Sequence, residues 1–228
     1  MRIARQAVDT NGRFTVALAG GSTPKAMYAL LATDAVLRAA LPVERMHFFW
    51  GDERPVPPDH ADSNFRMAHD AMLARLPLGE QQVHRISGEL ARADRAARDY
   101  ERRLREFFAL SPGQYPRFDL VLLGLGPDGH CASLFPGTRA LRARGRSAVS
   151  NWVGKLDAER ITLTPLALNN AAHVVFLVCG VDKAVALKAV LEGRHEPQQL
   201  PAQLIAPRDG TLTWFADRAA AHLLSGRG

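Results

Sequence analysis

The chain has 228 residues, of which 47% are hydrophobic and 23% are charged; this is an ordinary globular composition with enough apolar residues for a core, which excludes a disordered chain. The formal net charge is +6, but basic residues alternate with acidic ones and form no stripe with aromatic residues, so nucleic acid is not an expected partner. No apolar run approaches the ~18 residues of a membrane span, the N-terminus has no hydrophobic signal core and only two cysteines occur, so we expect a soluble, cytoplasmic protein with no membrane partner.

Short apolar runs followed by amphipathic segments recur along the chain, and they predict buried strands that alternate with helices. Strands are expected at residues 14–19, 46–50, 118–123 and 174–179, and helices at 25–32, 63–76, 94–108 and 183–191. A short strand should begin at Arg160, and a last strand, which could be an antiparallel edge, is expected at 212–215 after a turn at 207–210. This order predicts an α/β fold with a mostly parallel sheet covered on both faces, in one domain over residues 1–228.

Ligands of open α/β sheets bind outside the carboxyl ends of the strands, so the residues after each apolar run form the candidate site. After the first run, Gly20 and Gly21 allow a ligand to approach the backbone closely, and the start of the next helix favours a phosphate. Ser22 or Thr23 could instead only cap that helix, with Pro24 in its first turn. The local sequence favours neither interpretation over the other.

Charged residues follow the second run directly. Asp52 and Arg54 must lie at the rim of a buried strand, where they could form an ordinary surface ion pair. Alternatively, the arginine could point at a polar substrate with a carboxylate beside it. The downstream sequence Asp62-Ser63-Asn64 is better explained, on local grounds, as the cap of the next helix.

The loop after the third run, residues 124–129, matches the dinucleotide fingerprint G-x-G-x-x-G. That fingerprint requires a helix to begin there and an acidic residue about 20 positions further on. Here Pro136 breaks any helix and residues 142–150 contain no carboxylate, which excludes the dinucleotide site. His130 remains, two residues after Asp128; a lone loop histidine is usually a surface residue, whereas one oriented by a carboxylate has the arrangement of a general base.

Lys183 follows the fourth run and opens a helix, where a cation is unfavourable against the helix dipole. A lysine at this place is better explained if it meets an anion held at the same end, although a freely solvated lysine is the plain alternative. Arg160 is a second candidate for the same anion. The scattered histidines show no metal-ligand spacing, so no metal is expected.

Together these motifs resemble the 6-phosphogluconolactonase family, within the glucosamine-6-phosphate isomerase/6-phosphogluconolactonase superfamily. The matching stretches fall in the family's order and spacing at residues 18–24, 50–54, 62–64, 124–136, 160–162, 180 and 183. The resemblance implies a three-layer α/β/α fold with a Rossmann-like sheet and no cofactor. It also implies hydrolysis of 6-phospho-D-glucono-1,5-lactone to 6-phosphogluconate in the oxidative pentose phosphate pathway.

The resemblance further implies roles for individual residues. His130 is the base that activates water for attack on the lactone carbonyl, Asp128 orients it, and Arg54, flanked by Asp52, positions the lactone or stabilises its developing charge. The residues expected to hold the phosphate are Gly20, Gly21, Ser22, Thr23, Arg160 and Lys183. The expected partner is thus a small phosphorylated sugar lactone, and we expect a monomer.

Two departures from the family pattern matter. The chain begins inside what is usually the first helix, at residues 2–11, so we expect that the strand preceding it in the family is missing. The deaminase branch carries a glutamate for ring opening where residues 132–136 have no carboxylate, which favours lactone hydrolysis over glucosamine-6-phosphate deamination. A non-enzymatic sugar-phosphate sensor is a further alternative; it could lose His130 or Arg54, and both are present.

Overall fold

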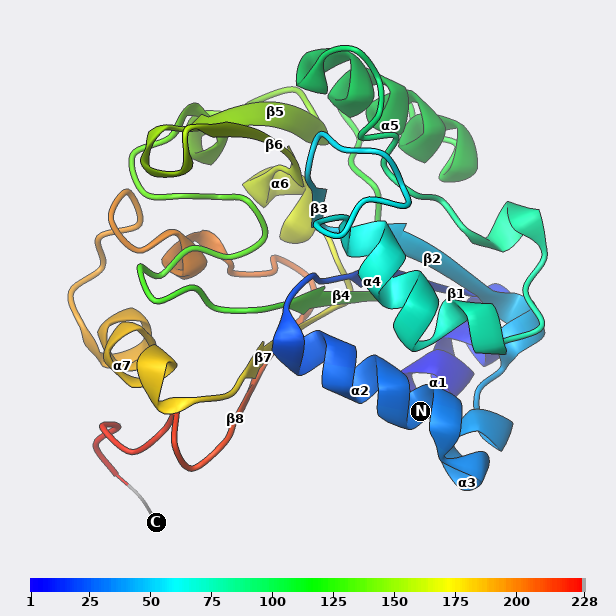
Figure 1. Cartoon of the computed structure of the whole chain (residues 1–228), viewed down its shortest axis with the longest axis horizontal. Coiled ribbons are helices and arrows are strands. Elements are labelled where there is room, and N and C mark those ends of the chain that lie inside the picture. Colours follow the sequence, from blue (N-terminus) through cyan, green and yellow to red (C-terminus); the bar gives the residue numbers. More distant parts are fainter. Residues whose placement is uncertain (227–228) are drawn as a thin grey trace.

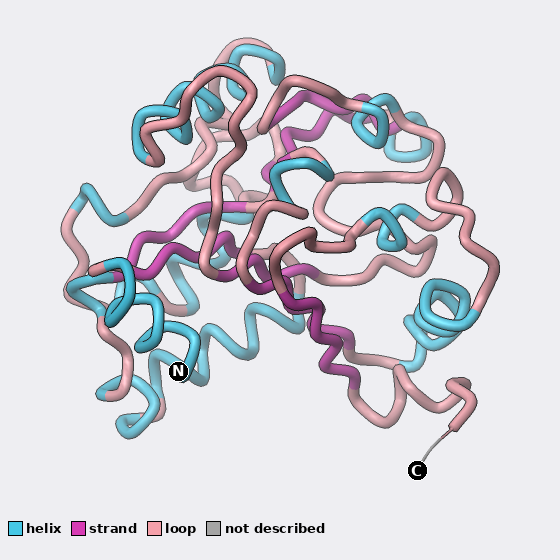
Figure 2. The backbone as a smooth tube through the Cα atoms, turned by 180° about the vertical axis from the view of Figure 1, so that it is seen from behind, coloured by secondary structure: helices cyan, strands magenta, loops and turns pink. Residues whose placement is uncertain are grey.

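The computed structural model of the protein describes residues 1–226, and its larger sheet has five parallel strands in the order β2-β1-β4-β7-β8 (Figures 1 and 2). These strands are β1 (Phe14–Leu18), β2 (Met46–Trp50), β4 (Leu120–Leu123), β7 (His173–Val178) and β8 (Thr211–Ala216). The first four confirm the predicted strands to within two residues at each end. Their continuous apolar runs reflect a sheet that is covered on both faces.

The last strand, β8, runs parallel to β7, with His173 opposite Thr211 and Val178 opposite Ala216. The alternative of an antiparallel edge strand is therefore wrong. The chain between the two strands contains helix α7 (Ala184–Glu192). A crossover of this length can bring the chain from the carboxyl end of β7 back to the edge of the sheet at which the strands begin. The turn at residues 207–210 thus ends a crossover and does not close a hairpin.

Helices cover both faces of the larger sheet, as the three-layer prediction requires (Figure 1). Tyr28 of α2 (Ser22–Thr33) packs on one face, and Phe107 of α5 (Ala93–Phe107) packs on the other, with 5.1 Å between its ring centroid and that of Phe49. The remaining helices are α1 (Arg2–Asn11), α3 (Ala35–Ala39), α4 (Asn64–Ala71) and α6 (Pro165–Leu168). Short 3-10 turns occupy Val43–Arg45, Leu73–Arg75, Glu80–Gln82, Arg139–Arg142, Gly154–Leu156, Val181–Lys183 and Pro201–Leu204.

Helix α4 is shorter than the sequence predicts, because it ends at Ala71 and not at residue 76. Met72 leaves the helical conformation with φ −142° and ψ −54°, and a 3-10 turn follows. Leu76 directly precedes Pro77, and the residue before a proline is sterically disfavoured in the helical conformation, so the helix could not continue through residue 76.

A smaller antiparallel sheet lies beside α5 and continues from the end of β2. Its strands are β3 (Asp52–Glu53), β6 (Ala158–Leu163) and β5 (Ala148–Val153), in the order β3-β6-β5. Strand β6 confirms the strand expected at Arg160, whereas β3 and β5 have no counterpart among the predicted strands. The pairing of Asp52 with Thr162 joins β6 to the chain that leaves the larger sheet.

Two buried tyrosines fix the points where β1 and β2 end. The Tyr28 hydroxyl donates to the carbonyl oxygen of Ala19 and accepts from its N–H, both at 3.0 Å. The Tyr100 hydroxyl donates to the carbonyl oxygen of Trp50 at 2.9 Å and accepts from its N–H at 3.0 Å. Burial raises the pKa of both phenols. The peptide groups at the ends of both strands are thereby satisfied without a strand neighbour, so the loops leave the sheet at fixed positions.

The carboxylate of Glu53 ties the loop after β3 to the start of α4. It accepts hydrogen bonds from the backbone N–H of Arg54 (2.8 Å), Asn64 (2.7 Å) and Phe65 (2.8 Å) and from Oγ of Ser63 (3.1 Å). The side chain is buried, with 2% of the residue exposed, and burial raises its pKa even though the three backbone donors oppose the rise. One side chain therefore positions both Arg54 and Asn64.

We predict that Glu53→Ala lowers the free energy of unfolding by roughly 2–4 kcal/mol, because four donors lose their acceptor in a buried place. Urea denaturation measures this loss. Glu44→Ala is the matched control, since Glu44 is exposed and its loss should change stability by less than about 0.5 kcal/mol. Equal stability of the two variants would contradict the role given to Glu53.

Candidate active site

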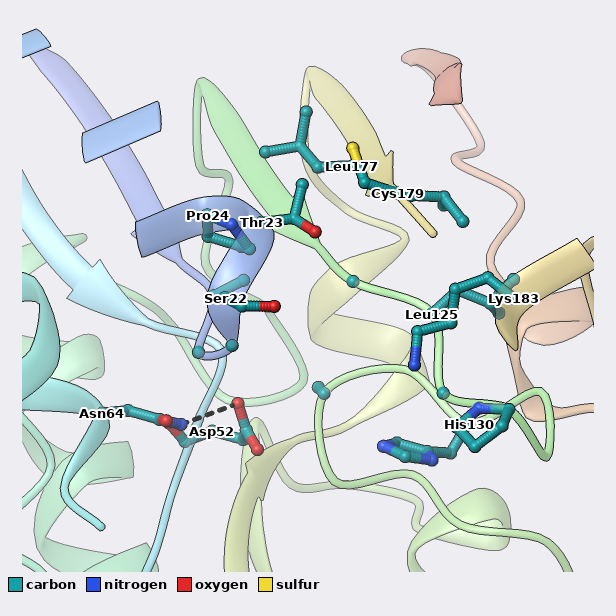
Figure 3. A pocket seen from close by; sticks show the side chains of 18 of the residues that line it. Ser22, Thr23, Pro24, Asp52, Asn64, Leu125, His130, Leu177, Cys179 and Lys183 are labelled. Atoms are coloured by element: carbon teal, nitrogen blue, oxygen red, sulfur yellow. Dashed lines mark hydrogen bonds between the residues drawn. The ribbon is translucent and has the colours of Figure 1, made fainter. Parts of the chain in front are cut away.

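A pocket opens at the carboxyl ends of β1, β4 and β7 and beside β3 (Figure 3). It is lined by residues 19–24, 124–127 and 177–179 and by Asp52, Arg54, Asn64, His130, Ala132 and Lys183. Ser22 and Asp52 lie on one side of it, and His130 and Lys183 on the other (Figure 3). The structure thus brings eight of the ten predicted site residues to one cavity, while Asp128 and Arg160 lie outside its lining.

The start of α2 forms one wall, and no side chain among residues 1–226 caps it. Gly21 is the N-cap residue, with φ 102°, and Ser22 and Thr23 are the first two residues of the helix. The capping interpretation of these two residues is therefore wrong. The N–H groups of the first turn have no side-chain acceptor, and such groups together with the helix dipole suit an anion.

Asn64 lies against this wall and fills the space beside Gly20. A Cβ atom on Gly20 would lie 2.1 Å from the Oδ1 atom of Asn64, so any larger residue there would displace the Asn64 side chain. The Asn64 amide donates to the carbonyl oxygen of Asp52 at 2.9 Å and to its Oδ1 at 3.3 Å. The neighbouring Ser63 does cap α4, since its Oγ accepts from the N–H of Arg66 at 3.1 Å. The cap predicted for this stretch is confirmed for Ser63, but Asn64 belongs to the pocket.

The Asp52 carboxylate is buried, and Ser133 contacts the oxygen that Asn64 does not. Oγ of Ser133 donates to Oδ2 of Asp52 at 2.6 Å, and only 8% of Asp52 is exposed. Within residues 1–226, Asp52 forms no ion pair with Arg54, so the surface ion-pair interpretation is wrong for these two residues. Arg54 instead donates to the carbonyl oxygen of Asp62 and reaches the pocket lining.

His130 is oriented from its edge, its face and the backbone below it. Its Nδ1 lies 2.5 Å from Oδ1 of Asp128, and the ring of Phe135 stacks on it at 4.1 Å between centroids. A Cβ atom on Gly126 would lie 2.0 Å from Nδ1, so the loop approaches the imidazole as closely as a glycine permits. An ionised carboxylate only accepts hydrogen bonds, so Nδ1 carries the proton and Nε2 has the free lone pair.

Burial lowers the pKa of His130 to about 4. The Asp52 carboxylate opposes this change, and the positive charges of Lys183 and Arg160 add to it. The imidazole is therefore neutral at neutral pH, which is the state that a base needs.

Two basic side chains, Lys183 and Arg160, lie at or near the same pocket. The ammonium of Lys183, at the start of α7, pairs with Asp182 at 2.8 Å. The Lys183 side chain is less exposed than that of Asp182. Arg160 on β6 donates to the carbonyl oxygen of Glu159, and burial together with the charge of Arg54 lowers its pKa. A cation whose pKa is lowered by a neighbouring cation is stabilised by an anionic ligand nearby.

The loop after β4 lacks the helix that the dinucleotide fingerprint requires. Residues 124–134 contain no helix, and the next helical turn begins only at Arg139. Among residues 1–226, no group of three or more His, Cys, Asp or Glu side chains is arranged to hold a metal ion. The described helices include none that is both long enough and apolar enough to span a bilayer.

The fold and the pocket together define an α/β protein with a histidine and an uncapped helix start at its strand ends. Residues 1–214 match the family of glucosamine-6-phosphate isomerases/6-phosphogluconolactonase, and the chain belongs to this family. A 6-phosphogluconolactonase of Synechocystis sp. is 44% identical over 96% of this chain and 88% of its own length. One of Rattus norvegicus is 41% identical over 94% of this chain and 82% of its own length.

Solved structures agree with this assignment. The 6-phosphogluconolactonase from Trypanosoma cruzi has a TM-score of 0.85 and 30% sequence identity, over 99% of this chain and 89% of its own. A monomeric glucosamine-6-phosphate deaminase has a TM-score of 0.76 over 98% of this chain and 94% of its own, and its 21% identity makes it evidence of the fold alone. The predicted family and the predicted fold class are confirmed.

We predict that Gly126→Ala lowers kcat by about 100-fold or more, because the new methyl group displaces the imidazole of His130 from its position above the loop. Gly79→Ala is the matched control, since the nearest side-chain atom to its new Cβ would be 3.8 Å away, at Gln82. Steady-state rates of both variants measure the effect, and their thermal unfolding shows whether each is folded. A folded Gly126→Ala variant with normal kcat would contradict the placement of His130.

Proposed function

We infer that this protein hydrolyses 6-phospho-D-glucono-1,5-lactone to 6-phosphogluconate, a step of the oxidative pentose phosphate pathway. Family membership and the relatives named above support the reaction. The observation that carries the mechanism is a neutral, partly buried histidine, paired with Asp128 and facing a pocket that Arg54 and Lys183 also line. Neither a metal nor a cofactor takes part in the scheme proposed here.

We propose that Nε2 of His130 removes a proton from a water molecule as its oxygen attacks the lactone carbonyl carbon. Arg54 then stabilises the negative charge that develops on the carbonyl oxygen. The bond between the carbonyl carbon and the ring oxygen breaks, and the imidazolium returns its proton to that oxygen. Asp128 stabilises the imidazolium in between, and Asp52, held by Ser133 and Asn64, adds a fixed negative charge that also favours it.

The substrate phosphate would bind at the start of α2. The uncapped first turn at Gly20, Gly21, Ser22 and Thr23 offers backbone and hydroxyl donors, and Lys183 offers a charge from the opposite wall. Arg160 belongs to the proposed phosphate-binding residues, although it lies outside the pocket lining. Its charge interacts with Arg54 and His130, which both line the pocket.

The alternative within the same fold is glucosamine-6-phosphate deamination. Phe135 is the residue stacked on His130, and residues 132–136 provide no carboxylate for ring opening. Release of ammonia from glucosamine 6-phosphate would support this alternative. A non-enzymatic sugar-phosphate sensor would bind the lactone without accelerating its hydrolysis.

We also propose that residues 1–228 form one domain and that the protein is a cytoplasmic monomer that binds neither nucleic acid nor membranes. One continuous cluster of buried residues extends from Ala4 to Ala220 and supports the single domain. Cys131 and Cys179 are both free, which agrees with a reducing compartment.

Replacing the base tests the mechanism. We predict that His130→Ala lowers kcat by roughly 100- to 10,000-fold, after the spontaneous rate without protein is subtracted. The reason is that no other group at that position can accept the proton. Phosphosugar binding should remain, and isothermal titration with 6-phosphogluconate measures it. A variant that binds and still hydrolyses the lactone at the normal rate would remove His130 from the mechanism.

Replacing the lysine tests the phosphate site. We predict that Lys183→Ala raises KM for the phosphorylated lactone about 10-fold and changes kcat little, because a charged contact to the phosphate is lost. The rate with unphosphorylated δ-gluconolactone should not change, which provides the control substrate. An unchanged KM would exclude Lys183 from the phosphate site.

A further inference from the structure

A lysine outside the pocket lining contacts both groups that orient His130. Lys155 lies in the 3-10 turn Gly154–Leu156, which connects β5 to β6. Its ammonium forms an ion pair with Oδ2 of Asp128 and lies 4.9 Å from the centre of the Phe135 ring. The other carboxylate oxygen of Asp128 contacts His130, and the Phe135 ring stacks on the same imidazole.

These contacts form a closed ring of four side chains. Asp128 meets His130 at the edge of the imidazole, Phe135 covers its face, and Lys155 contacts both Asp128 and Phe135. Lys155 is itself half exposed, with 49% of its side chain accessible. Neither Lys155 nor Asp128 lines the pocket, so the lysine makes its contacts with the site through these two neighbours.

We propose that Lys155 is a positioning residue for lactone hydrolysis, which fixes the Asp128 carboxylate and thereby the orientation and charge of His130. This inference rests on the proposed role of His130 as the base. A carboxylate with two oxygens, one on a lysine and one on the imidazole, has a single preferred orientation. Without the lysine, Asp128 can rotate and the base loses its fixed geometry.

The charge of Lys155 also offsets the charge of Asp128. The charged groups that face His130 are Asp128 and Asp52, which stabilise the imidazolium, and Lys155, Lys183 and Arg160, which destabilise it. Removing the ammonium leaves the carboxylate of Asp128 uncompensated beside Nδ1. His130 then takes up a proton at higher pH, and the acid limb of kcat/KM moves upward by about 0.5 pH unit. A lysine that only anchored the hairpin would not move this limb.

The test measures kcat, KM and the pH profile of hydrolysis of the phosphorylated lactone for the wild type and a series of variants. Lys155→Met removes the charge and keeps the aliphatic stem, Lys155→Arg keeps the charge, and Asp128→Asn removes the partner alone and in the double variant. Lys188→Met is the matched control, because Lys188 is similarly half exposed and pairs with Glu192 at 3.4 Å outside the pocket.

The proposal expects Lys155→Met to lower kcat about 10-fold with KM within about two-fold, and to shift the acid limb as stated. Lys155→Arg should restore kcat to within about two-fold, and Lys188→Met should behave as the wild type. The double variant should be no slower than Asp128→Asn alone, because the lysine acts through that carboxylate. Thermal unfolding of each variant confirms that the rates belong to folded protein.

Three results would overturn the proposal: a Lys155→Met variant with the kcat and acid limb of the wild type, a raised KM with unchanged kcat, or a double variant slowed by the full product of both single effects. His130→Ala in the same series separates the proposed role of Lys155 from the proposed role of His130 as the base. If that variant is inactive while Lys155→Met is normal, the base stands and Lys155 has no positioning role. If His130→Ala stays active, the assignment of the base itself fails.

Discussion

The parallel pairing of β1 with both β2 and β4 is the constraint on which the site depends. Phe14 to Leu18 pair with Met46 to Trp50 in register, and Val16 pairs with Leu120 on the other side. Parallel strands bring their carboxyl ends to one edge of the sheet, so three loops that are far apart in the sequence begin within one pocket. The hydroxyls of Tyr28 and Tyr100 then satisfy the last peptide groups of β1 and β2, which fixes where these loops start.

From this edge, each element supplies a different part of the chemistry. The start of α2 provides uncapped N–H groups, and α7 begins with the cationic Lys183, so charge and donors for an anion converge from two walls. The loop after β4 supplies a histidine whose pKa burial lowers, so that its imidazole stays neutral beside these cations. The smaller sheet completes the arrangement, since β3 carries Asp52 and the β5–β6 turn carries Lys155.

The sequence predicts well whatever is encoded locally. Four apolar runs identify four strands. Because ligands bind at strand ends, the residues after those runs are the site candidates, and they include His130, Arg54 and Lys183. Contacts between distant segments leave no such local pattern. Ser133 meets Asp52 across 81 positions and Lys155 meets Asp128 across 27, so neither partner can be found from spacing. The direction of β8 depends likewise on the path of a crossover, and Asn64 reads locally as part of a helix cap although its side chain turns to Asp52.

The central claim is that a neutral histidine and an anion site act together on one substrate, a phosphorylated lactone. The most direct measurement is kcat/KM of the wild-type protein for freshly generated 6-phosphogluconolactone and for unphosphorylated δ-gluconolactone, each above its spontaneous rate. The account predicts acceleration of the first and a preference for it of at least about 1,000-fold, because a site built for a charged group rejects an analogue that lacks it. Equal rates for the two lactones, or no acceleration by folded protein, would contradict it.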